Sequence, residues 1–309
     1  MATIDLVTGV LETLDGRCVI AGHRSGSGDW LIRSPPPGRV KILAVSRGAL
    51  WFRLASEPEA FLVSTGEAVI LDGLSEFEFG TRPDMAPTRA VPGEPISPIS
   101  ADDRNVCVTA HIEATGGSDA FLQGAVPGMT HVRAESAAGR AIAWLLGELD
   151  VEMNHDLPGS HRAAEQIVEL LLVHVMRVWM SDGMDLPAGW IRLLREPILL
   201  PAARLIHSQP RFPVTVNELA RSCALSRTIF IERFRASAGV PPATYVFNWK
   251  MRLATSLLET TDAPVEQIAH RLGYSSASSF NVAFKRWIGM TPGKHRKIAS
   301  QRSAAFRPG

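Results

Sequence analysis

The stretch GYSSASSFNVAFKRWIGMTP, residues 273–292, decides the fold of the C-terminal part of the chain. Phe280, Phe284 and Trp287 recur in it at helical spacing and predict one buried face. On a helical wheel of about 100° per residue, four other residues cluster opposite Phe280. These outward residues are Ser278, Asn281, Val282 and Lys285. Short polar side chains followed by a cation suit a helix that enters a DNA major groove, although a solvated helix face has a similar composition.

An earlier stretch repeats this pattern. ELARSCALSRTIFIERFRASAGVPP, residues 218–242, matches it at an offset of 49 residues before the turn and 50 after it. Phe230 and Phe234 correspond to Phe280 and Phe284. The outer face of the first copy carries Thr228, Ile231, Glu232 and Arg235, with Arg227 at the helix start. Two copies at such spacing predict two helix-turn-helix units.

Local signals define where these helices begin. Thr215 and Glu218 form a T-x-x-E capping box, and Ser226 is placed to cap the next helix. Pro264 suits a first helical position. Between the two units, residues 241–260 predict one long helix that rises about 28 Å. That length is plausible for holding two helices in successive major-groove segments, which lie about 34 Å apart.

The two turns differ in sequence. Gly273 supplies the positive φ that a tight turn between helices needs. Ala224 stands at the equivalent position of the first copy, where the same conformation costs about 1–2 kcal/mol. We therefore expect a slightly different turn in the first unit.

Charge is distributed unevenly along the chain. Residues 211–309 hold 15 Lys and Arg against 5 Asp and Glu, whereas residues 1–210 hold 17 against 26. A basic module joined to an acidic one indicates a polyanion-binding end, although a solvated basic surface would give the same counts. The three cysteines are scattered without paired spacing, which fits a reducing compartment.

Residues 1–130 have the pattern of a β-structure. The segments 40–54, 60–73 and 105–114 are rich in Val, Ile, Leu and aromatic residues, and residues 64–67 look like a tight turn. The proline-rich segment 81–100 is expected to be a long irregular loop. Short strands with turn signals indicate a small β-sandwich or barrel.

Two helices are expected next, over residues 136–153 and 161–180. The second is apolar almost all round and therefore needs partners on more than one side. A second subunit or the interior of the same chain would each serve. It is too short and too interrupted by polar residues to span a bilayer, and the N-terminus has no secretory pattern.

The C-terminal residues resemble the AraC/XylS family of bacterial transcription regulators. The resemblance is carried by LARSCALSRTIFIERFRASAGVPPATYV and RLATSLLETTDAPVEQIAHRLGYSSASSFNVAFKRWIGMTPGKHR, together with their spacing. The preceding part looks like the cupin-type sensor of one branch of that family, on the segments GEAVILDG and GWIRLLREPILLPAARLIHSQP.

The expected class is therefore α+β, with a cupin-like β-barrel or sandwich, two linker helices and an all-α domain with two helix-turn-helix units. We expect an effector-sensing domain at 1–130, a helical linker and dimerisation region at 131–189, and the DNA-binding domain at 190–309.

The resemblance implies a cytoplasmic regulator that binds double-stranded DNA through two adjacent major-groove segments. It further implies a small-molecule effector, a homodimer, contact with RNA polymerase and no membrane partner. The residues expected to contact DNA are Arg227, Thr228, Ile231, Glu232, Arg235, Ser276, Ala277, Ser278, Asn281, Val282, Lys285, Lys294 and Arg296. Val282 stands where the family often has a long polar residue, so the second unit is expected to contribute less base reading than the first.

Nothing in the sequence indicates an active site, a cofactor or a metal centre. Cupin metal sites need several histidines and a carboxylate, and the β-region offers only His23, His111 and His131, all isolated. Asp72 and Glu76 are expected to be solvated single carboxylates near a turn. Cys107 is expected to be a small core residue, with redox sensing as an unsupported alternative.

Three hypotheses remain from the sequence. The first is a DNA-binding regulator whose β-domain senses an effector. The second is a constitutive regulator whose β-domain only dimerises. The third is a cupin enzyme with an accessory DNA-binding module, against which the missing histidines count.

Overall fold

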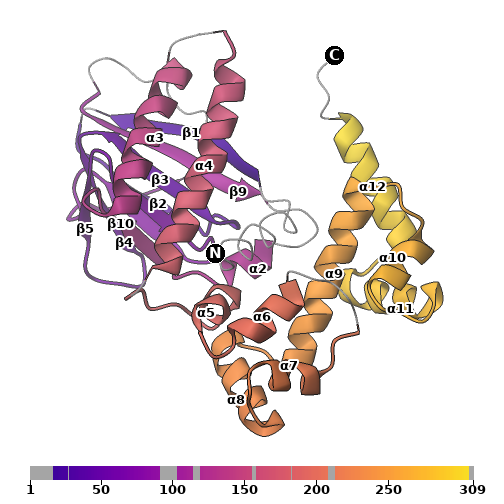
Figure 1. Ribbon diagram of the computed structural model, residues 1–309. Coiled ribbons are helices and arrows are strands. Elements are labelled where there is room, and N and C mark those ends of the chain that lie inside the picture. Colours follow the sequence, from indigo (N-terminus) through magenta and orange to yellow (C-terminus); the bar gives the residue numbers. More distant parts are fainter. Residues whose placement is uncertain are drawn as a thin grey trace. The chain divides into compact units, whose positions relative to one another are not determined.

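The computed structural model describes residues 17–26, 28–90, 103–113, 119–154, 158–181, 183–207 and 213–305. They form two compact units, drawn in Figure 1. The first, here called the β-unit, comprises Arg17–Glu113 and Leu122–Pro187. The second, here called the helical unit, contains residues 119–121 and 188–305 of the described chain. The expected α+β class is confirmed.

The β-unit contains two five-stranded sheets. The first has the order β1 (Arg17–Gly26), β9 (Asn105–Glu113), β3 (Lys41–Arg47), β6 (Ala68–Leu71) and β10 (Met129–Val132), paired antiparallel throughout. The second has the order β5 (Phe61–Ser64), β4 (Ala49–Leu54), β7 (Phe77–Gly80), β2 (Leu31–Ser34) and β8 (Thr88–Arg89), of which only β2 and β8 pair in parallel.

Two of the three apolar segments expected from the sequence divide into two strands that join different sheets, whereas residues 105–114 contain the single strand β9. Residues 40–54 become β3 and β4, and residues 60–73 contain β5 and β6. Gly48 makes the first of these crossings at φ 76°, and a Cβ there would collide with the carbonyl oxygen of Arg104. The chain therefore changes sheet at a residue that only glycine suits.

The core of the β-unit is made of alternate residues from both sheets. On β7, Phe77 and Phe79 belong to this core while Glu78 between them points the other way. The buried members of this core are Leu43, Val45, Leu50, Phe52, Val63, Val69, Leu71, Phe77, Phe79 and Cys107. Cys107 is a free, fully buried thiol, as expected for a small core residue, and burial raises its pKa to about 12.

Glu78 lies in a row of charged residues across the second sheet. It faces Arg33 on β2 and Arg53 on β4 in the strand register, and both guanidinium groups form ion pairs with it. Only 1% of Glu78 is exposed. Burial alone would raise the pKa of Glu78, but hydrogen bonds from the two arginines outweigh it and leave the pKa lowered.

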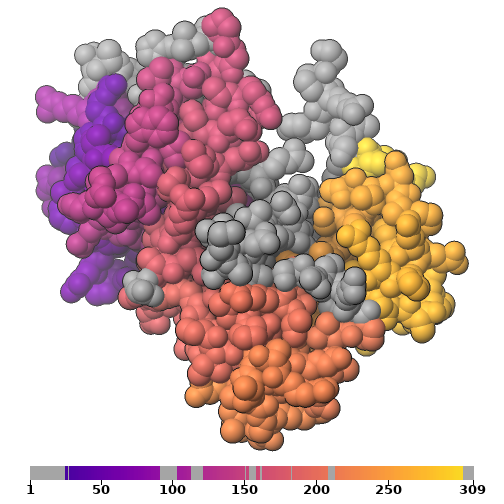
Figure 2. Space-filling view, viewed as in Figure 1, coloured from indigo at the N-terminus to yellow at the C-terminus, as the bar shows by residue number. Residues whose placement is uncertain are grey.

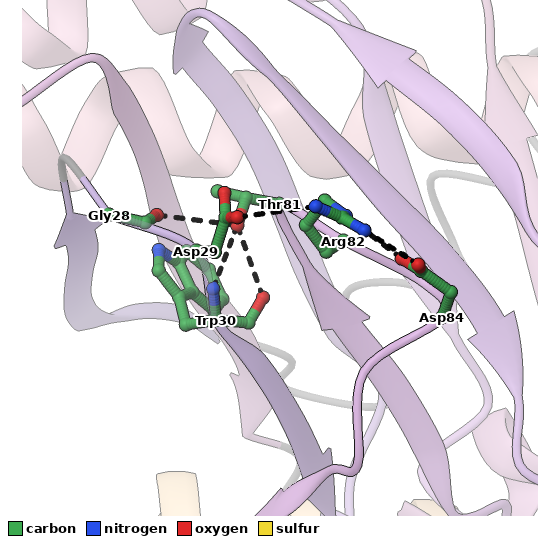
Figure 3. A network of polar contacts seen from close by, with 6 residues as sticks. All are labelled: Gly28, Asp29, Trp30, Thr81, Arg82 and Asp84. Carbon is green, nitrogen blue, oxygen red and sulfur yellow. Dashed lines mark hydrogen bonds and ion pairs between the residues drawn. The ribbon is translucent and has the colours of Figure 1, made fainter.

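A second polar network joins the start of β2 to the end of β7 (Figure 3). Thr81 accepts a 2.8 Å hydrogen bond from the backbone N–H of Trp30. Arg82 forms ion pairs with Asp29 and Asp84. All of these charged groups are exposed, so the network fixes the two loops rather than forming an enclosed site.

Two long helices, α3 (Ala137–Asn154) and α4 (Ser160–Met180), pack against each other and against the first sheet. Both were expected from the sequence. Trp179 anchors α4, because its indole N–H donates to the hydroxyl of Thr130 on β10 at 3.2 Å. None of the helices in the described part of the chain combines the length and the apolar run needed to cross a bilayer.

The helical unit is built around α9 (Pro242–Thr260). The other helices are α5 (Trp190–Arg195), α6 (Leu200–His207), α7 (Val216–Ser222), α8 (Arg227–Ala238), α10 (Val265–Arg271), α11 (Ala277–Ile288) and α12 (Pro292–Ala305). Figure 1 shows the pair α7–α8 and the pair α10–α11 at opposite ends of α9. At 19 residues, α9 rises about 28 Å, as expected.

One aromatic ring of the helical unit comes from an unexpected part of the chain. Phe121 lies in the short helix α2 (Asp119–Gln123), between strands β9 and β10 in sequence. Its ring stacks on Trp190 at 5.6 Å and lies 6.2 Å from Trp249, centroid to centroid. The guanidinium of Arg252 sits 4.1 Å from the ring centroid. No pattern in the sequence singled out this residue.

Candidate nucleic-acid interface

The two helix-turn-helix units share one turn geometry. In the first, the N–H of Leu225 donates to the carbonyl of Ala220 at 3.0 Å, and in the second that of Tyr274 donates to Ala269 at 3.0 Å. Gly273 has φ 76°, as expected. Ala224 has φ 54°, so the expectation of a different first turn is wrong. The first unit adopts the left-handed conformation in spite of the alanine side chain.

The helix starts follow the capping signals. Thr215 and Glu218 form the full capping box, with each side chain bonded to the other's backbone N–H. Ser226 caps α8 by accepting from the N–H of Ile229. Pro264 occupies the cap position before α10 and not the first helical position, which corrects the expectation.

The second helices of the two units, α8 and α11, have the same length, and their caps and buried residues fall at the same positions. Each has 12 residues, begins after a serine cap and ends at a glycine with positive φ, Gly239 or Gly289. The inward residues are fully buried, and they are Phe230 and Phe234 on α8, and Phe280 and Phe284 on α11. The extra residue of the second copy is Ser275, between the turn and the cap. The inward placement of the four phenylalanines is confirmed, and Trp287, also expected on the buried face, is half-buried against the same core.

The outer face of α8 is exposed to solvent. Arg227, Thr228, Glu232 and Arg235 are exposed, and Ile231 is half-buried. Asn217 on α7 accepts a 3.1 Å hydrogen bond from the guanidinium of Arg227. Arg227 is thereby oriented at the first turn of α8, through a residue that sequence reasoning missed. The ten-residue separation of Asn217 and Arg227 gave no signal in the sequence.

The outer face of α11 is also exposed, but it is less polar. Ser278, Asn281 and Lys285 are exposed, and Val282 shows 68% of its surface to solvent. Ser276 is the cap of α11, since its hydroxyl accepts from the N–H of Ser279 at 3.1 Å. Ala277 is half-buried. Ser276 is therefore already committed to holding the helix start.

Asn281 lines an open groove of about 440 Å³. The rest of its lining comes from Ala277 and from the starts of α10 and α12, namely Pro264, Val265, Glu266, Thr291 and Gly293. Asn281 therefore lies on a groove that the starts of two other helices also border. Thr291 of this groove was not among the residues expected from the sequence.

Lys294 and Arg296 were both expected to point toward phosphates from α12. Lys294 is exposed. Arg296 is partly buried and donates to the carbonyls of Leu258, at 3.4 Å, and Ala263, at 2.5 Å. It ties α12 to the C-terminal end of α9, and in this position its guanidinium is turned toward the protein backbone. This corrects the outward placement of Arg296.

The candidate metal residues of the β-unit have other partners. His111 lies 2.9 Å from a guanidinium nitrogen of Arg39, and His131 lies 3.2 Å from a carboxylate oxygen of Glu67. The side chain of His23 lies outside the described residues. In the described part of the chain, no three His, Cys, Asp or Glu side chains are arranged so that they could hold a metal ion.

Asp72 does not fit the expectation of a solvated carboxylate. It is 8% exposed and accepts hydrogen bonds from the backbone N–H groups of Leu74, at 2.8 Å, and Ser75, at 3.1 Å. Its side chain closes the turn between β6 and β7, which is the reason for its burial. Glu76 is half-buried.

Comparison with known proteins gives matches to both parts of the chain. The sequence pattern of a family described as Cupin matches residues 5–181, and that of a helix-turn-helix domain matches residues 219–298. An AraC-like transcription regulator of Streptomyces antibioticus is 29% identical over 301 residues, which cover 95% of this chain and 99% of that protein. The chain belongs to the AraC-like transcription regulators.

Two further relatives of this AraC-like regulator match over shorter spans. The HTH-type transcriptional regulator AlkR of Acinetobacter baylyi is 32% identical over 194 residues, which are 62% of each chain. The solved DNA-binding domain of AdpA, in complex with a target DNA, is 28% identical and covers 35% of this chain and 96% of that one, with a TM-score of 0.33. The two domain matches and the full-length relative show that the AraC-like regulator is a DNA-binding transcription regulator with an N-terminal cupin domain.

Proposed function

We propose that the AraC-like regulator reads two adjacent major-groove segments of double-stranded DNA with α8 and α11. The observation that carries this proposal is the match between the two helices in length, caps, buried phenylalanines and exposed outer face. Their attachment to opposite ends of α9 supports simultaneous use on one DNA molecule.

The proposed contacts divide by chemistry. The cations Arg227, Arg235, Lys285 and Lys294 neutralise phosphates and supply salt-dependent affinity. The side chains proposed to meet base edges are Thr228, Ile231, Glu232, Ser278, Asn281 and Val282. Asparagine pairs well with adenine, and an exposed valine offers an apolar contact to a thymine methyl group. Ser276 and Ala277 lie at the start of α11, and Arg296 acts by fixing α12.

The experiment compares two variants on duplexes selected from a random-sequence library. Lys285→Ala should weaken binding to all duplexes and reduce the salt slope by about one. Asn281→Ala should change base preference, by about 1–3 kcal/mol at one base pair, because it removes a bidentate hydrogen-bonding group.

Arg162→Ala on α4 is the matched control. It removes the same charge from an exposed residue of the β-unit, where Arg162 pairs with Glu165, and should leave DNA binding unchanged. An unchanged preference in the Asn281 variant would remove its assigned role in base reading.

We also propose a small-molecule effector for the β-unit, as its cupin relationship supports. The space between its sheets holds ten buried core side chains, so an effector bound there must displace side chains. That filled core specifically favours the alternative, a constitutive regulator whose β-unit only dimerises. Native mass spectrometry of the purified protein distinguishes them. An added mass whose removal changes DNA affinity supports an effector, and no added mass supports the alternative.

The remaining assignments belong to the same proposal. The functional division is a sensing domain at 1–130, a linker and dimerisation region at 131–189 and a DNA-binding domain at 190–309. The regulator acts as a homodimer in the cytoplasm, where it meets RNA polymerase at the promoter. Its relatives are transcription regulators, which supports a function without catalysis.

A further inference from the structure

The two helix-turn-helix units differ in charge at two equivalent positions. Figure 2 shows their surfaces apart from each other, the first in orange at the bottom of the view and the second in light orange and yellow at the right. The first helices, α7 and α10, each have seven residues, and the second of these is Asn217 in α7 and Glu266 in α10. The second helices begin with Arg227 in α8 and Ala277 in α11. An amide and a guanidinium in the first unit are thus replaced by a carboxylate and a methyl group in the second.

Asn217 holds two guanidinium groups in the first unit. Its side-chain oxygen accepts a 3.1 Å hydrogen bond from a terminal nitrogen of Arg227 on α8. Its backbone carbonyl accepts a 3.3 Å hydrogen bond from the Nε atom of Arg221, near the end of α7. All three residues are exposed to solvent. One residue therefore brings together a cation from each helix of the unit.

The two guanidinium groups keep most of their hydrogen-bonding capacity. An arginine has five N–H donors, and Arg221 and Arg227 each give one of them to Asn217. The carboxylate of Glu218, close by in sequence, accepts from the backbone N–H and the hydroxyl of Thr215, both at 2.7 Å. No carboxylate in the described part of the chain forms an ion pair with either arginine. Two neighbouring cations of this kind favour an anion bound by both, because it relieves their mutual repulsion.

We propose that Asn217 is a positioning residue that sets Arg227 and Arg221 to bind one phosphate of the DNA backbone together. The inference rests on the phosphate contact of Arg227 in the proposed function, and it adds the residue that orients this contact and a second cation. The planar fork of a guanidinium matches the oxygens of a phosphate. A side chain held in place before binding loses less conformational entropy when the complex forms.

The second unit has no such arrangement. Glu266 and Ala277 line the same open groove, so the two equivalent positions are also neighbours there. Ala277 carries no charge, and the exposed carboxylate of Glu266 repels a phosphate at this place. The first unit therefore supplies the larger share of the salt-dependent affinity for DNA.

A double-mutant cycle in the full-length protein tests the role of Asn217. It uses the duplex selected from the random-sequence library and a duplex of unrelated sequence. Arg227→Ala should weaken binding to both about tenfold and reduce the salt slope by about one. Asn217→Ala should weaken binding about threefold or more, and less than about twofold when Arg227→Ala is already present. Asn217→Asp should weaken it further than Asn217→Ala, because a carboxylate neutralises Arg227.

A transfer of the pair to the second unit tests the same inference by gain of affinity. Glu266→Asn combined with Ala277→Arg should tighten binding to both duplexes about tenfold and steepen the salt slope by about one to two. Gln166→Ala is the matched control for Asn217→Ala. It removes an exposed amide of the β-unit that is hydrogen-bonded to Glu169, and it should leave DNA binding unchanged.

The possible results separate positioning from a structural role. A purely structural role of Asn217 would lower the temperature of thermal unfolding, and its effect on binding would persist in full beside Arg227→Ala. Either result would overturn the inference, as would a transferred pair that leaves the salt slope unchanged. If Arg227→Ala weakens binding and Asn217→Ala does not, only this inference fails. If Arg227→Ala itself has no effect, the phosphate contact of the proposed function fails with it.

Discussion

Ala224 shows how one residue can keep a conformation that its side chain opposes. Its φ of 54° is the only positive value among the non-glycine residues that the structure describes. The hydrogen bonds on either side match those at Gly273, so the packing of the two helices imposes the turn. The sequence shows only the local cost of alanine, and the tertiary constraint that exceeds this cost arises from packing.

A pair of opposite substitutions measures that constraint. Ala224→Gly should stabilise the helical unit by up to about 1 kcal/mol, because it relieves the left-handed alanine. Gly273→Ala should destabilise it by about 1 kcal/mol for the converse reason. Urea unfolding of both variants beside the parent protein checks the signs. Effects of the same sign would show that the two turns are not equivalent.

His207 makes the helical unit sensitive to acid. It is buried beside Trp249, with its Nε2 atom 3.0 Å from the hydroxyl of Tyr245, and burial lowers its pKa to about 3 from 6.5. Between these values the unfolded chain binds a proton and the native state does not, so stability falls as pH falls. The expected loss between pH 7 and pH 5 is about 2 kcal/mol.

The variant His207→Gln lacks the titrating group, so its free energy of unfolding should fall by about 2 kcal/mol less between pH 7 and pH 5 than that of the parent protein. Denaturant unfolding at the two pH values measures this difference. All other residues are the same in both proteins, so the difference between the proteins reports His207 alone. An identical slope in the two proteins would show that folding does not lower the pKa of His207.

At the scale of elements, the helices were predicted more completely than the strands. The long helices α3, α4 and α9 follow from continuous helix-length segments, and the repeated pair of units has a clear period in the sequence. Strands β1, β2, β7 and β10 and the short helix α2 were not singled out, and β8 lies in the segment that was expected to be an irregular loop. Their identity depends on pairing with residues distant in sequence, as when β1 pairs with β9. Only that pairing supplies their backbone partners.

The candidate nucleic-acid interface was also predicted only in part from the sequence. The buried phenylalanines and exposed outer faces follow from helical spacing alone. The position of Arg296 does not, because its acceptors, the carbonyls of Leu258 and Ala263, lie on backbone more than 30 residues earlier. The cap role of Ser276 is local and could have been read from its match to Ser226.

The charged row of Arg33, Glu78 and Arg53 links three strands and should show in the acid stability of the β-unit. The pKa of Glu78 is lowered on folding, so its contribution is present above the ordinary value of 4.5 and is lost as pH falls below it. Glu78→Gln should cost about 2 kcal/mol at pH 7, a value discounted because both arginines reach solvent.

The same variant should lose less stability than the parent protein between pH 5 and pH 3. Thermal unfolding across this range checks both effects. Asp84→Asn is the control, since Asp84 is also paired with an arginine but is exposed, and it should change little. A variant as acid-sensitive as the parent protein would contradict the role of Glu78.

At the scale of the whole molecule, Phe121 belongs to the helical unit although it lies between β9 and β10 in sequence. Phe121→Ala removes a ring that stacks on Trp190 and lies under Arg252, and should destabilise the helical unit by about 2–3 kcal/mol. Hydrogen exchange resolved by peptide should rise across α9 and stay unchanged across α3 and α4. Leu74→Ala, which alters an exposed loop residue, is the control. Equal exchange across α9 in the variant and the parent would contradict this contribution.

Phe121 also limits how freely this regulator can be recombined with others. A hybrid spliced just before Trp190 would take Trp190 and Trp249 from one parent and the residue at position 121, which packs on them, from the other. Only an N-terminal part with an aromatic residue at position 121 would cover the rings of Trp190 and Trp249. Without that residue, the two rings would be open to water and to association with other chains. Exchanging the N-terminal part between such regulators therefore requires a choice at two places. The first is the splice before Trp190, and the second is position 121 inside the N-terminal part.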